Sequence, residues 1–449
     1  MILVRVTAAI PPLQYCRVPT DETVTATAPS KSSASSAPSA ASQYPERVPY
    51  GPCFCIGLGG LFAGVTGPLL STFIPPMVRD ALGEHRTAIG MVMAIDNVLL
   101  LLLVPWSGTA SDRSSAAGRG RLPIIIGGLL LSALGMALFP WAPRFGIAGI
   151  IAAILLLYTG INVQRSPFQA LVADAVPSRF RSLATGSVTF QMCVGAIVFL
   201  MLGHALGMRV AFLIAAATVL VIAAGLRFGL VEPPPDGTPA AEATFRSLLD
   251  AFKEALSGVV PGMRAIFVAA LFLQLVFQTF TTWFALHGTE RFGVRPQDVT
   301  IGFIAWAVGG VIGALPAGWV GVRFGRRNAM LLGFGIMAAA LVALDRVTSV
   351  TAATPLLALA SAAWTFPTVN AYPMFVEPIP PARRGVLASL FLLCMALGGG
   401  IGDPMNGALF DLFGSYRPMF LMMAAYTALA FVAVLRIPRG AGEAAEAVA

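Results

Sequence analysis

Long apolar runs separated by short polar loops make up most of this chain. A helix needs about 20 mainly apolar residues to cross the hydrocarbon core of a bilayer, and twelve runs after residue 50 meet this requirement. They lie at 52–76, 87–109, 122–142, 146–172, 185–206, 208–230, 264–288, 299–321, 328–345, 352–376, 385–410 and 416–437. The pattern predicts an all-α membrane protein of twelve transmembrane helices.

Polar segments divide these runs into two groups of six. Residues 1–50 are rich in Ser, Ala, Thr and Pro and predict a disordered cytoplasmic tail without the features of a signal peptide. Between the groups, a linker places Leu248, Leu249, Phe252 and Leu256 on one side of a short helix, which predicts an amphipathic helix on the membrane surface. The predicted domains are the tail 1–50, an N-terminal six-helix bundle 51–230, the cytoplasmic linker 231–263, a C-terminal six-helix bundle 264–438 and a cytoplasmic tail 439–449.

The composition agrees with a membrane protein and excludes several other classes. Hydrophobic residues make up 57% of the chain and charged residues only 11%, whereas soluble domains carry about 25% charged residues. The net charge of +8 is explained by basic loops facing anionic lipid, so no nucleic-acid partner is expected. The cysteines show neither zinc-site nor disulfide spacing, so neither a metal nor a cofactor is expected; they are Cys16, Cys53, Cys55, Cys193 and Cys394.

The distribution of basic residues predicts the orientation. With the N-terminus inside, the cytoplasmic segments hold 20 Lys and Arg residues and the external loops 8, which leaves Arg165 within a helix. This bias follows the positive-inside rule. Only Lys31 and Lys253 are lysines, and the prevalence of Ala, Gly and Arg is typical of a GC-rich bacterial gene. We therefore predict a multi-pass protein of a bacterial inner membrane with both termini in the cytoplasm.

Two loop types recur in the same order in both groups of helices. Gly108 and Arg113 lie five residues apart after the second run, as do Gly318 and Arg323 after the eighth, 210 residues later. An acidic residue and a proline lie three residues apart after the fourth and tenth runs, where Asp174 and Glu377 are 203 residues apart. Two loop types repeating at nearly the same spacing predict a duplicated six-helix unit.

The charged residues of these loops suit a gate at the cytoplasmic ends of the helices. Carboxylates at helix ends and arginines on neighbouring loops can hold the helices together in one conformation and release them in another. The alternative is that the charges only set the topology, and both roles are compatible. The predicted gating charge cluster consists of Asp112, Arg113, Asp174, Arg181, Glu377 and Arg383.

At these loops the chain resembles the major facilitator superfamily. Gly108 followed by Asp112-Arg113 and by Arg119-Gly120-Arg121 resembles the signature between the second and third helices of that family. In the second copy, Val322 stands at the acidic position, which implies a weaker contact there. The resemblance covers nearly all of the chain after residue 50 and implies two pseudo-symmetric six-helix bundles around a central cavity.

A finer resemblance is to the sugar:cation symporters, the bacterial relatives of the sucrose-transporter and glycoside–pentoside–hexuronide group. The segments that carry it are 93–97 with 105–108, 164–174, 370–374 with Glu377, and 286–290. The related melibiose-type sodium symporters have two carboxylates where this chain has Leu100 and Val104, and the first helix lacks the carboxylate of plant sucrose symporters. The resemblance therefore implies proton coupling rather than sodium coupling.

Ionisable side chains inside the predicted helices are candidates for function, since each costs about 2.5–3.5 kcal/mol at the centre of a bilayer on insertion scales. Asp96 is the candidate for proton coupling; the alternative is a structural hydrogen bond. Arg165 shares a helix face with Tyr158 and Asn162 and is the candidate for orienting the solute; the alternative is a pair with the cytoplasmic charges. Asp403 follows the glycine run 398–402, which favours close helix packing over a site at Asp403.

Two further helices carry polar stripes. Hydrogen-bonding side chains beside an aromatic face are typical of sugar sites, although hydrogen bonds between helices explain single residues equally well. With the polar face that Arg165 shares, the predicted solute-binding residues are Tyr158, Asn162, Arg165, Gln274, Gln278, Thr281, Trp364 and Asn370.

Together these features predict a secondary active transporter that moves a small polar solute, a sugar or glycoside, by alternating access with proton symport. It would act as a monomer in the lipid bilayer. One alternative is a proton-coupled exporter of a drug or metabolite; another is a non-transporting receptor or assembly factor on the same fold. A membrane enzyme is not expected, because the sequence shows no nucleophile–base pair, metal cluster or phosphate-binding loop.

Overall fold

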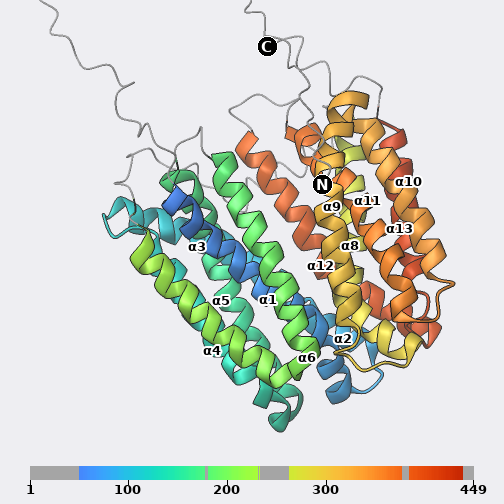
Figure 1. The fold of residues 1–449 in the computed structure, drawn as a ribbon, viewed down its shortest axis with the longest axis horizontal. Coiled ribbons are helices and arrows are strands. Elements are labelled where there is room, and N and C mark those ends of the chain that lie inside the picture. The colour runs from blue at the N-terminus through green and yellow to red at the C-terminus, as the bar shows by residue number, and fades with distance from the viewer. Residues whose placement is uncertain (1–49, 177–180, 231, 233–261, 377–383, 438–449) are drawn as a thin grey trace, which may run out of the picture. The chain divides into compact units, whose positions relative to one another are not determined.

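The computed structural model describes residues 50–176, 181–230, 232, 262–376 and 384–437. These residues belong to one compact unit, 47–449, and every element within them is a helix (Figure 1). The predicted tails, the linker helix, Glu377 and Arg383 lie outside the described residues, apart from the edges of the tail and linker ranges. The side chain of Arg181 is also outside them.

The first group of helices runs from blue to green in Figure 1. It consists of α1 (Tyr50–Leu82), α2 (Arg86–Met93), α3 (Ile95–Ala116), α4 (Leu122–Leu138), the short 3-10 helix η2 (Phe139–Phe145), α5 (Gly146–Ala175) and α6 (Arg181–Gly229). The second group runs from yellow to red and consists of α8 (Met263–Phe292), α9 (Thr300–Phe324), α10 (Arg326–Leu344), α11 (Val350–Val376), α12 (Arg384–Phe413) and α13 (Met419–Leu435).

Each of the twelve predicted spans coincides with a helix or with half of one, except that 87–109 covers both α2 and α3. The span 385–410 lies in α12. Within the described residues, eight helical stretches are long and apolar enough to cross a membrane, and α13 is a shorter apolar helix. Two of the eight stretches, Leu122–Val172 and Ala184–Gly229, each hold two predicted spans. The all-α, twelve-span prediction is confirmed. Below, the proximal end of a helix is the end level with Tyr50, where α1 begins, and the distal end is level with Leu82, where α1 ends.

Gly207 divides α6 into two passes. Its φ of 73° and ψ of 174° are not helical and belong to a region that is essentially restricted to glycine. The sequence predicted the spans 185–206 and 208–230 on either side of this residue. A single glycine therefore makes the distal turn between the fifth and sixth passes.

Helix pairing is the same in both groups. In the first group, α3 packs on α5, α4 on α5 and α6, and α1 on α6. In the second group the corresponding pairs are α9 with α11, α10 with α11 and α13, and α8 with α12 and α13. The recurrence of the same pairs supports the duplication inferred from the loops; the domain boundaries themselves stay a prediction.

The two groups meet along four pairs of helices: α2 with α12, α3 with α12, α1 with α8, and α6 with α9. Glycines bring α2 and α12 together, because small residues let helix backbones approach closely. A Cβ atom on Gly90 would lie 2.3 Å from the carbonyl oxygen of Asp403, and one on Gly407 would lie 2.4 Å from that of Arg86. One turn from Asp403, a Cβ on Gly399 would lie 2.2 Å from the Asn97 amide nitrogen. The contact between α2–α3 and α12 leaves no room for larger side chains at these positions.

Candidate functional site

Asp96 lies in the first turn of α3, midway along the second pass. The Nδ2 atom of Asn162, on α5, donates a hydrogen bond of 2.8 Å to the Asp96 carboxylate and another of 3.0 Å to the carbonyl oxygen of Tyr158. Asn162 is fully buried and Asp96 is half-buried. The sequence placed both residues in the membrane, and the structure brings them into direct contact across two helices.

Arg165 lies on α5 less than one turn beyond Asn162 and is exposed. It interacts electrostatically with Asp96, and within the described residues no ion pair joins the two side chains at 4 Å or less. Tyr158 is 7% exposed and lies in the electrostatic field of both Asp96 and Asp403. The polar face of α5 thus combines a buried amide that holds a carboxylate with an exposed guanidinium.

Across the boundary between the two groups, α8 and α12 contribute a second carboxylate. Gln278 Nε2 donates to Asp403 Oδ2 at 2.9 Å and to the hydroxyl of Thr282 at 3.3 Å. Asp403 has no exposed surface, and its Oδ1 atom has no hydrogen-bond partner among the described residues. Asp403 also interacts electrostatically with Asp96. From the sequence, the glycine run before Asp403 favoured a role in helix packing over a functional site.

The other predicted solute-binding residues lie in different surroundings. Gln274 and Thr281 are half-buried on α8, and the hydroxyl of Thr281 donates to the carbonyl of Phe277 in its own helix. The ring of Trp364 stacks on that of Phe277 at 5.2 Å, and its buried indole N–H has no hydrogen-bond partner in the described part of the chain. Asn370 is buried and donates to the carbonyl of Ala317, which ties α11 to α9.

Charged residues meet at the proximal ends of α3, α4 and α5. Arg121, just before α4, donates to Asp174 Oδ2 and to the Ser111 hydroxyl, both at 2.7 Å, and forms an ion pair with Asp112. Burial favours the neutral form of this guanidinium, but the hydrogen bonds to Asp112 and Asp174 outweigh it and raise the pKa of Arg121. Two members of the predicted gating cluster, Asp112 and Asp174, are therefore joined by an arginine outside that set, while Arg113 is exposed.

Glu232 adds a contact that the sequence did not reveal. Its two carboxylate oxygens accept hydrogen bonds of 2.5 Å from the backbone N–H groups of Arg121 and Leu122, at the start of α4. A carboxylate at this position satisfies free amides and is stabilised by the helix dipole. The residue follows α6, so the end of the sixth pass caps the beginning of the third. Its position at the head of a Pro-rich segment gave no signal for this pairing.

The equivalent loop of the second group is built differently. Val322, at the position of Asp112, is 89% exposed. Arg327 donates to the carbonyls of Leu435 at 2.9 Å and Ile437 at 2.8 Å, at the end of α13, where basic residues are favoured by the helix dipole. The duplicated loops therefore share a sequence pattern but use their arginines for different contacts.

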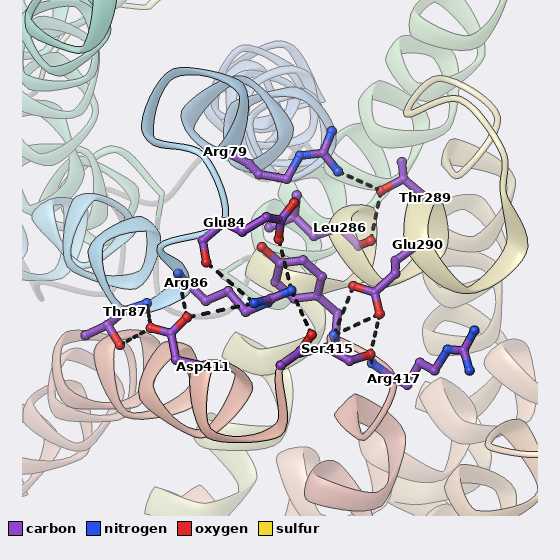
Figure 2. A network of polar contacts seen from close by, with 12 residues as sticks. Arg79, Glu84, Arg86, Thr87, Leu286, Thr289, Glu290, Asp411, Ser415 and Arg417 are labelled. Atoms are coloured by element: carbon purple, nitrogen blue, oxygen red, sulfur yellow. Dashed lines mark hydrogen bonds and ion pairs between the residues drawn. The ribbon is translucent and has the colours of Figure 1, made fainter.

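At the distal ends, polar contacts join the two groups directly (Figure 2). The Asp411 carboxylate, near the end of α12, accepts hydrogen bonds from the backbone N–H groups of Arg86 at 3.0 Å and Thr87 at 2.8 Å, and from the Thr87 hydroxyl at 2.6 Å. The guanidinium of Arg86 pairs with Glu84 at 3.0 Å and donates to the carbonyl of Gly414 at 3.2 Å. We call these five residues the distal clasp.

Neighbouring contacts extend the distal clasp over α1 and α8 (Figure 2). Arg79 donates to the Thr289 hydroxyl at 3.4 Å, and Glu290 accepts hydrogen bonds from the Ser415 hydroxyl and the backbone N–H of Tyr416. At the α6–α9 boundary, His204 Nδ1 lies 3.0 Å from the carbonyl oxygen of Gln297. These loops carried a charge count and, at 286–290, part of the sugar:cation symporter resemblance, but no predicted contact. Their pairing depends on how the two groups meet, which no local pattern records.

The sequence as a whole matches the model of the Major Facilitator Superfamily over residues 56–307 and 289–448. The chain belongs to that family. This confirms the fold predicted from the loops, and it shows a multi-pass membrane transporter rather than an enzyme. A small-molecule solute and the lipid bilayer are accordingly its partners.

One sequence relative is named as an exporter. A protein of Staphylococcus aureus described as a staphylopine export protein is 23% identical over 381 residues, which cover 79% of this chain and 88% of the relative.

Several solved transporter structures align with this chain over nearly their whole lengths. A bacterial homologue of the human lysosomal transporter Spinster aligns with a TM-score of 0.69 at 16% identity, over 87% of this chain and 98% of its own. The nucleoside transporter NupG aligns with a TM-score of 0.70 at 14% identity, over 86% of this chain and 100% of its own. The fucose:proton symporter FucP of E. coli aligns with a TM-score of 0.56 at 17% identity, over 87% of this chain and 98% of its own. At these identities the likeness shows the fold, and the resemblance to sugar:cation symporters is consistent with it.

Proposed function

We propose that the protein is a proton-coupled secondary transporter that moves a small polar solute, a sugar or glycoside, by alternating access. The observation that carries the proposal is Asp96, a carboxylate within the second pass that is held by the buried amide of Asn162. A carboxylate in such surroundings is suited to bind and release a proton as its exposure changes. The nearby Arg165 has a planar set of donors that fits sugar hydroxyls.

Polar groups on the second group of helices also suit a polar cargo. Gln278 and Thr282 on α8 offer hydrogen-bonding groups, and the unpaired indole N–H of Trp364 on α11 offers a donor beside an aromatic face. Sugars are bound by this combination. In this proposal Arg165 orients the solute, Asn162 holds Asp96, Asp96 carries the proton, and the two groups of helices move about the site.

A second candidate function is proton-coupled export of a metabolite that carries carboxylate groups. The Staphylococcus aureus relative is an exporter, and an exposed guanidinium such as that of Arg165 also binds carboxylates in a bidentate manner. A non-transporting receptor on the same fold is the remaining alternative, and it would tolerate loss of both Asp96 and Arg165.

The test uses purified protein in liposomes that contain a pH-sensitive dye. A panel of disaccharides, monosaccharides, organic acids and staphylopine is added to wild type, Asp96→Asn and Arg165→Ala, with Asp80→Asn as a control carboxylate at the distal surface. We expect one sugar to acidify the lumen in wild type and the control, and Asp96→Asn to abolish this proton flux. Counterflow of a solute without proton movement would refute the coupling, and a response to staphylopine or an organic acid alone would favour the second candidate.

We also propose that the protein lies in a bacterial inner membrane as a monomer, with the proximal ends of its helices facing the cytoplasm. The excess of basic residues in the proximal loops supports this orientation. Cysteines placed at Gly118, in a proximal loop, and at Ser349, in a distal loop, test it in whole cells with a membrane-impermeant thiol reagent. Labelling at position 349 alone is expected, and labelling at 118 alone would reverse the orientation. Light scattering of the detergent-solubilised protein tests the monomer.

A further inference from the structure

The second buried carboxylate, Asp403, is not used by the function proposed above. It lies on α12 with no exposed surface, and Gln278 satisfies only one of its two oxygens. A buried oxygen without a hydrogen-bond partner is costly and is uncommon in folded proteins. A proton on this oxygen would convert it from an unsatisfied acceptor into a donor.

Asp403 and Asp96 come from different groups of helices, yet both lie at the contact between α2–α3 and α12. The backbone of Asp403 lies directly against Gly90 of α2, and Gly399, one turn earlier on α12, lies against the side chain of Asn97, next to Asp96. Asp96 and Asp403 interact electrostatically, and Tyr158 lies in the field of both. Two like charges in such an apolar contact repel strongly, because little water screens them.

The remaining groups that face this pair do not neutralise two negative charges. On α5, Arg165 is the one cation with a described electrostatic effect on Asp96, and it is exposed. On α8, the residues next to Asp403 are the neutral Gln278, Thr282 and Trp283. On α2, Arg86 is already paired with Glu84 and bound to Gly414 in the distal clasp.

The other titratable groups along these helices lie toward the helix ends, either in the proximal cluster, as do Asp112 and Asp174, or in the distal contacts. On α8, His287 contacts the carbonyl of Tyr416, and Glu290 accepts from Ser415 and Tyr416. On α12 itself, Asp411 binds the start of α2. In α11, the other helix beside α12, the sequence holds Tyr372 as its one titratable residue.

We infer that Asp96 and Asp403 share a single proton across the boundary between the two groups of helices, and that loss of this proton separates α3 from α12. With one proton present, only one of the two groups is charged, and the close contact between α3 and α12 persists. When the proton leaves to water, both carboxylates are charged, and their electrostatic repulsion opposes the contact between α3 and α12. Binding of one proton from water reverses the step. The inference rests on the proposed proton coupling and adds Asp403 as a second coupling residue.

The test measures the separation of the distal ends against pH, with no cargo present. Spin labels are attached at Arg144→Cys and Ser349→Cys, two exposed distal positions in different groups, in a chain without its native cysteines. The three histidines, His85, His204 and His287, are replaced by glutamine so that they do not titrate between pH 5 and 9. Distances are recorded for the parent, for Asp96→Asn, for Asp403→Asn and for the double variant.

We expect the parent to shift from short to long distal distances as the pH rises, with a slope corresponding to one proton. Each single substitution removes the repulsion and is expected to hold the distal ends together at every pH. The double variant should behave like either single variant, because residues that act through one interaction are not additive. Asp403→Glu should restore a pH-dependent shift. This result would show that Asp403→Asn loses its response because the carboxyl is absent and not because the protein misfolds. Asp80→Asn, an exposed distal carboxylate, serves as the matched control.

A parent-like pH response in Asp403→Asn would overturn the inference, as would additive effects of the two single substitutions or a parent without pH dependence. The liposome assay separates these outcomes from a failure of the proposed function. Proton flux that is lost in Asp96→Asn but unchanged in Asp403→Asn would leave proton coupling in place and refute the shared proton.

Discussion

The distal clasp gives a quantitative prediction for the substitution Asp411→Ala. Asp411 accepts hydrogen bonds from Arg86 N, Thr87 N and Thr87 Oγ1 at 2.6–3.0 Å, and each hydrogen bond to a charged group contributes about 1.5–3 kcal/mol when shielded from water. The Asp411 side chain is 37% exposed, so water competes for these bonds. The effect of a lost helix cap, up to about 2 kcal/mol, is therefore the better guide. The ion pair with Arg86 at 4.0 Å adds little to it.

A loss of about 2 kcal/mol corresponds to a shift of about 30-fold in the equilibrium between joined and separated distal ends, since 1.4 kcal/mol is tenfold. The spin-label pair at positions 144 and 349 reports this population directly. We expect Asp411→Ala to raise the ratio of the long-distance to the short-distance population about 30-fold over wild type. Asp80→Ala is the control, because Asp80 pairs with the neighbouring Arg79 in its own group and is 69% exposed. A change of less than about threefold in Asp411→Ala, or an equal change in the control, would refute the argument.

Three further predictions concern stability. Gly207→Ala forces a positive φ on a side chain and should cost about 1–3 kcal/mol, seen as a lower melting temperature in detergent; an unchanged melting temperature would contradict the strain. Glu232→Ala removes the cap of α4 at a cost of about 1 kcal/mol. Hydrogen exchange should therefore become faster at the amides of Arg121 and Leu122, and exchange as slow as in wild type would contradict the cap. A Cβ on Gly309 would lie 2.0 Å from the Ala358 carbonyl, so Gly309→Ala should destabilise the α9–α11 contact by about 1–3 kcal/mol, and a melting temperature equal to wild type would exclude that clash.

Features with a local physical cause could be predicted from the sequence. Apolar runs must form helices in a bilayer because backbone groups there have no water to bind, so the twelve spans and the division at Gly207 were found from the residues alone. The loop repeats predicted the duplication, which the matching helix pairs now support. Asp96 was chosen because an ionisable group inside a membrane is costly, and Asn162 because it shares a helix face with Arg165; the structure places the two in contact.

Features that depend on how helices meet could not be predicted in the same way. Asp112 and Asp174 were expected in one cluster, but nothing in the loop pattern distinguished Arg121 from Arg113 as their partner. Asp403 was assigned to packing because of its glycines, although the same glycines bring it close to Asp96. Glu232 and Asp411 cap helices that are distant in sequence, and such pairing leaves no periodic signal along the chain.

The contact of Asp411 with α2 has a consequence for local folding. His85, the residue before α2, forms no side-chain hydrogen bond to the helix start, and the free amides of Arg86 and Thr87 are satisfied by a carboxylate from the other half of the protein. The first turn of α2 is therefore complete only while the distal ends meet. When they part, this turn should fray, so that a change in the arrangement of whole bundles is accompanied by the melting of a single helical turn.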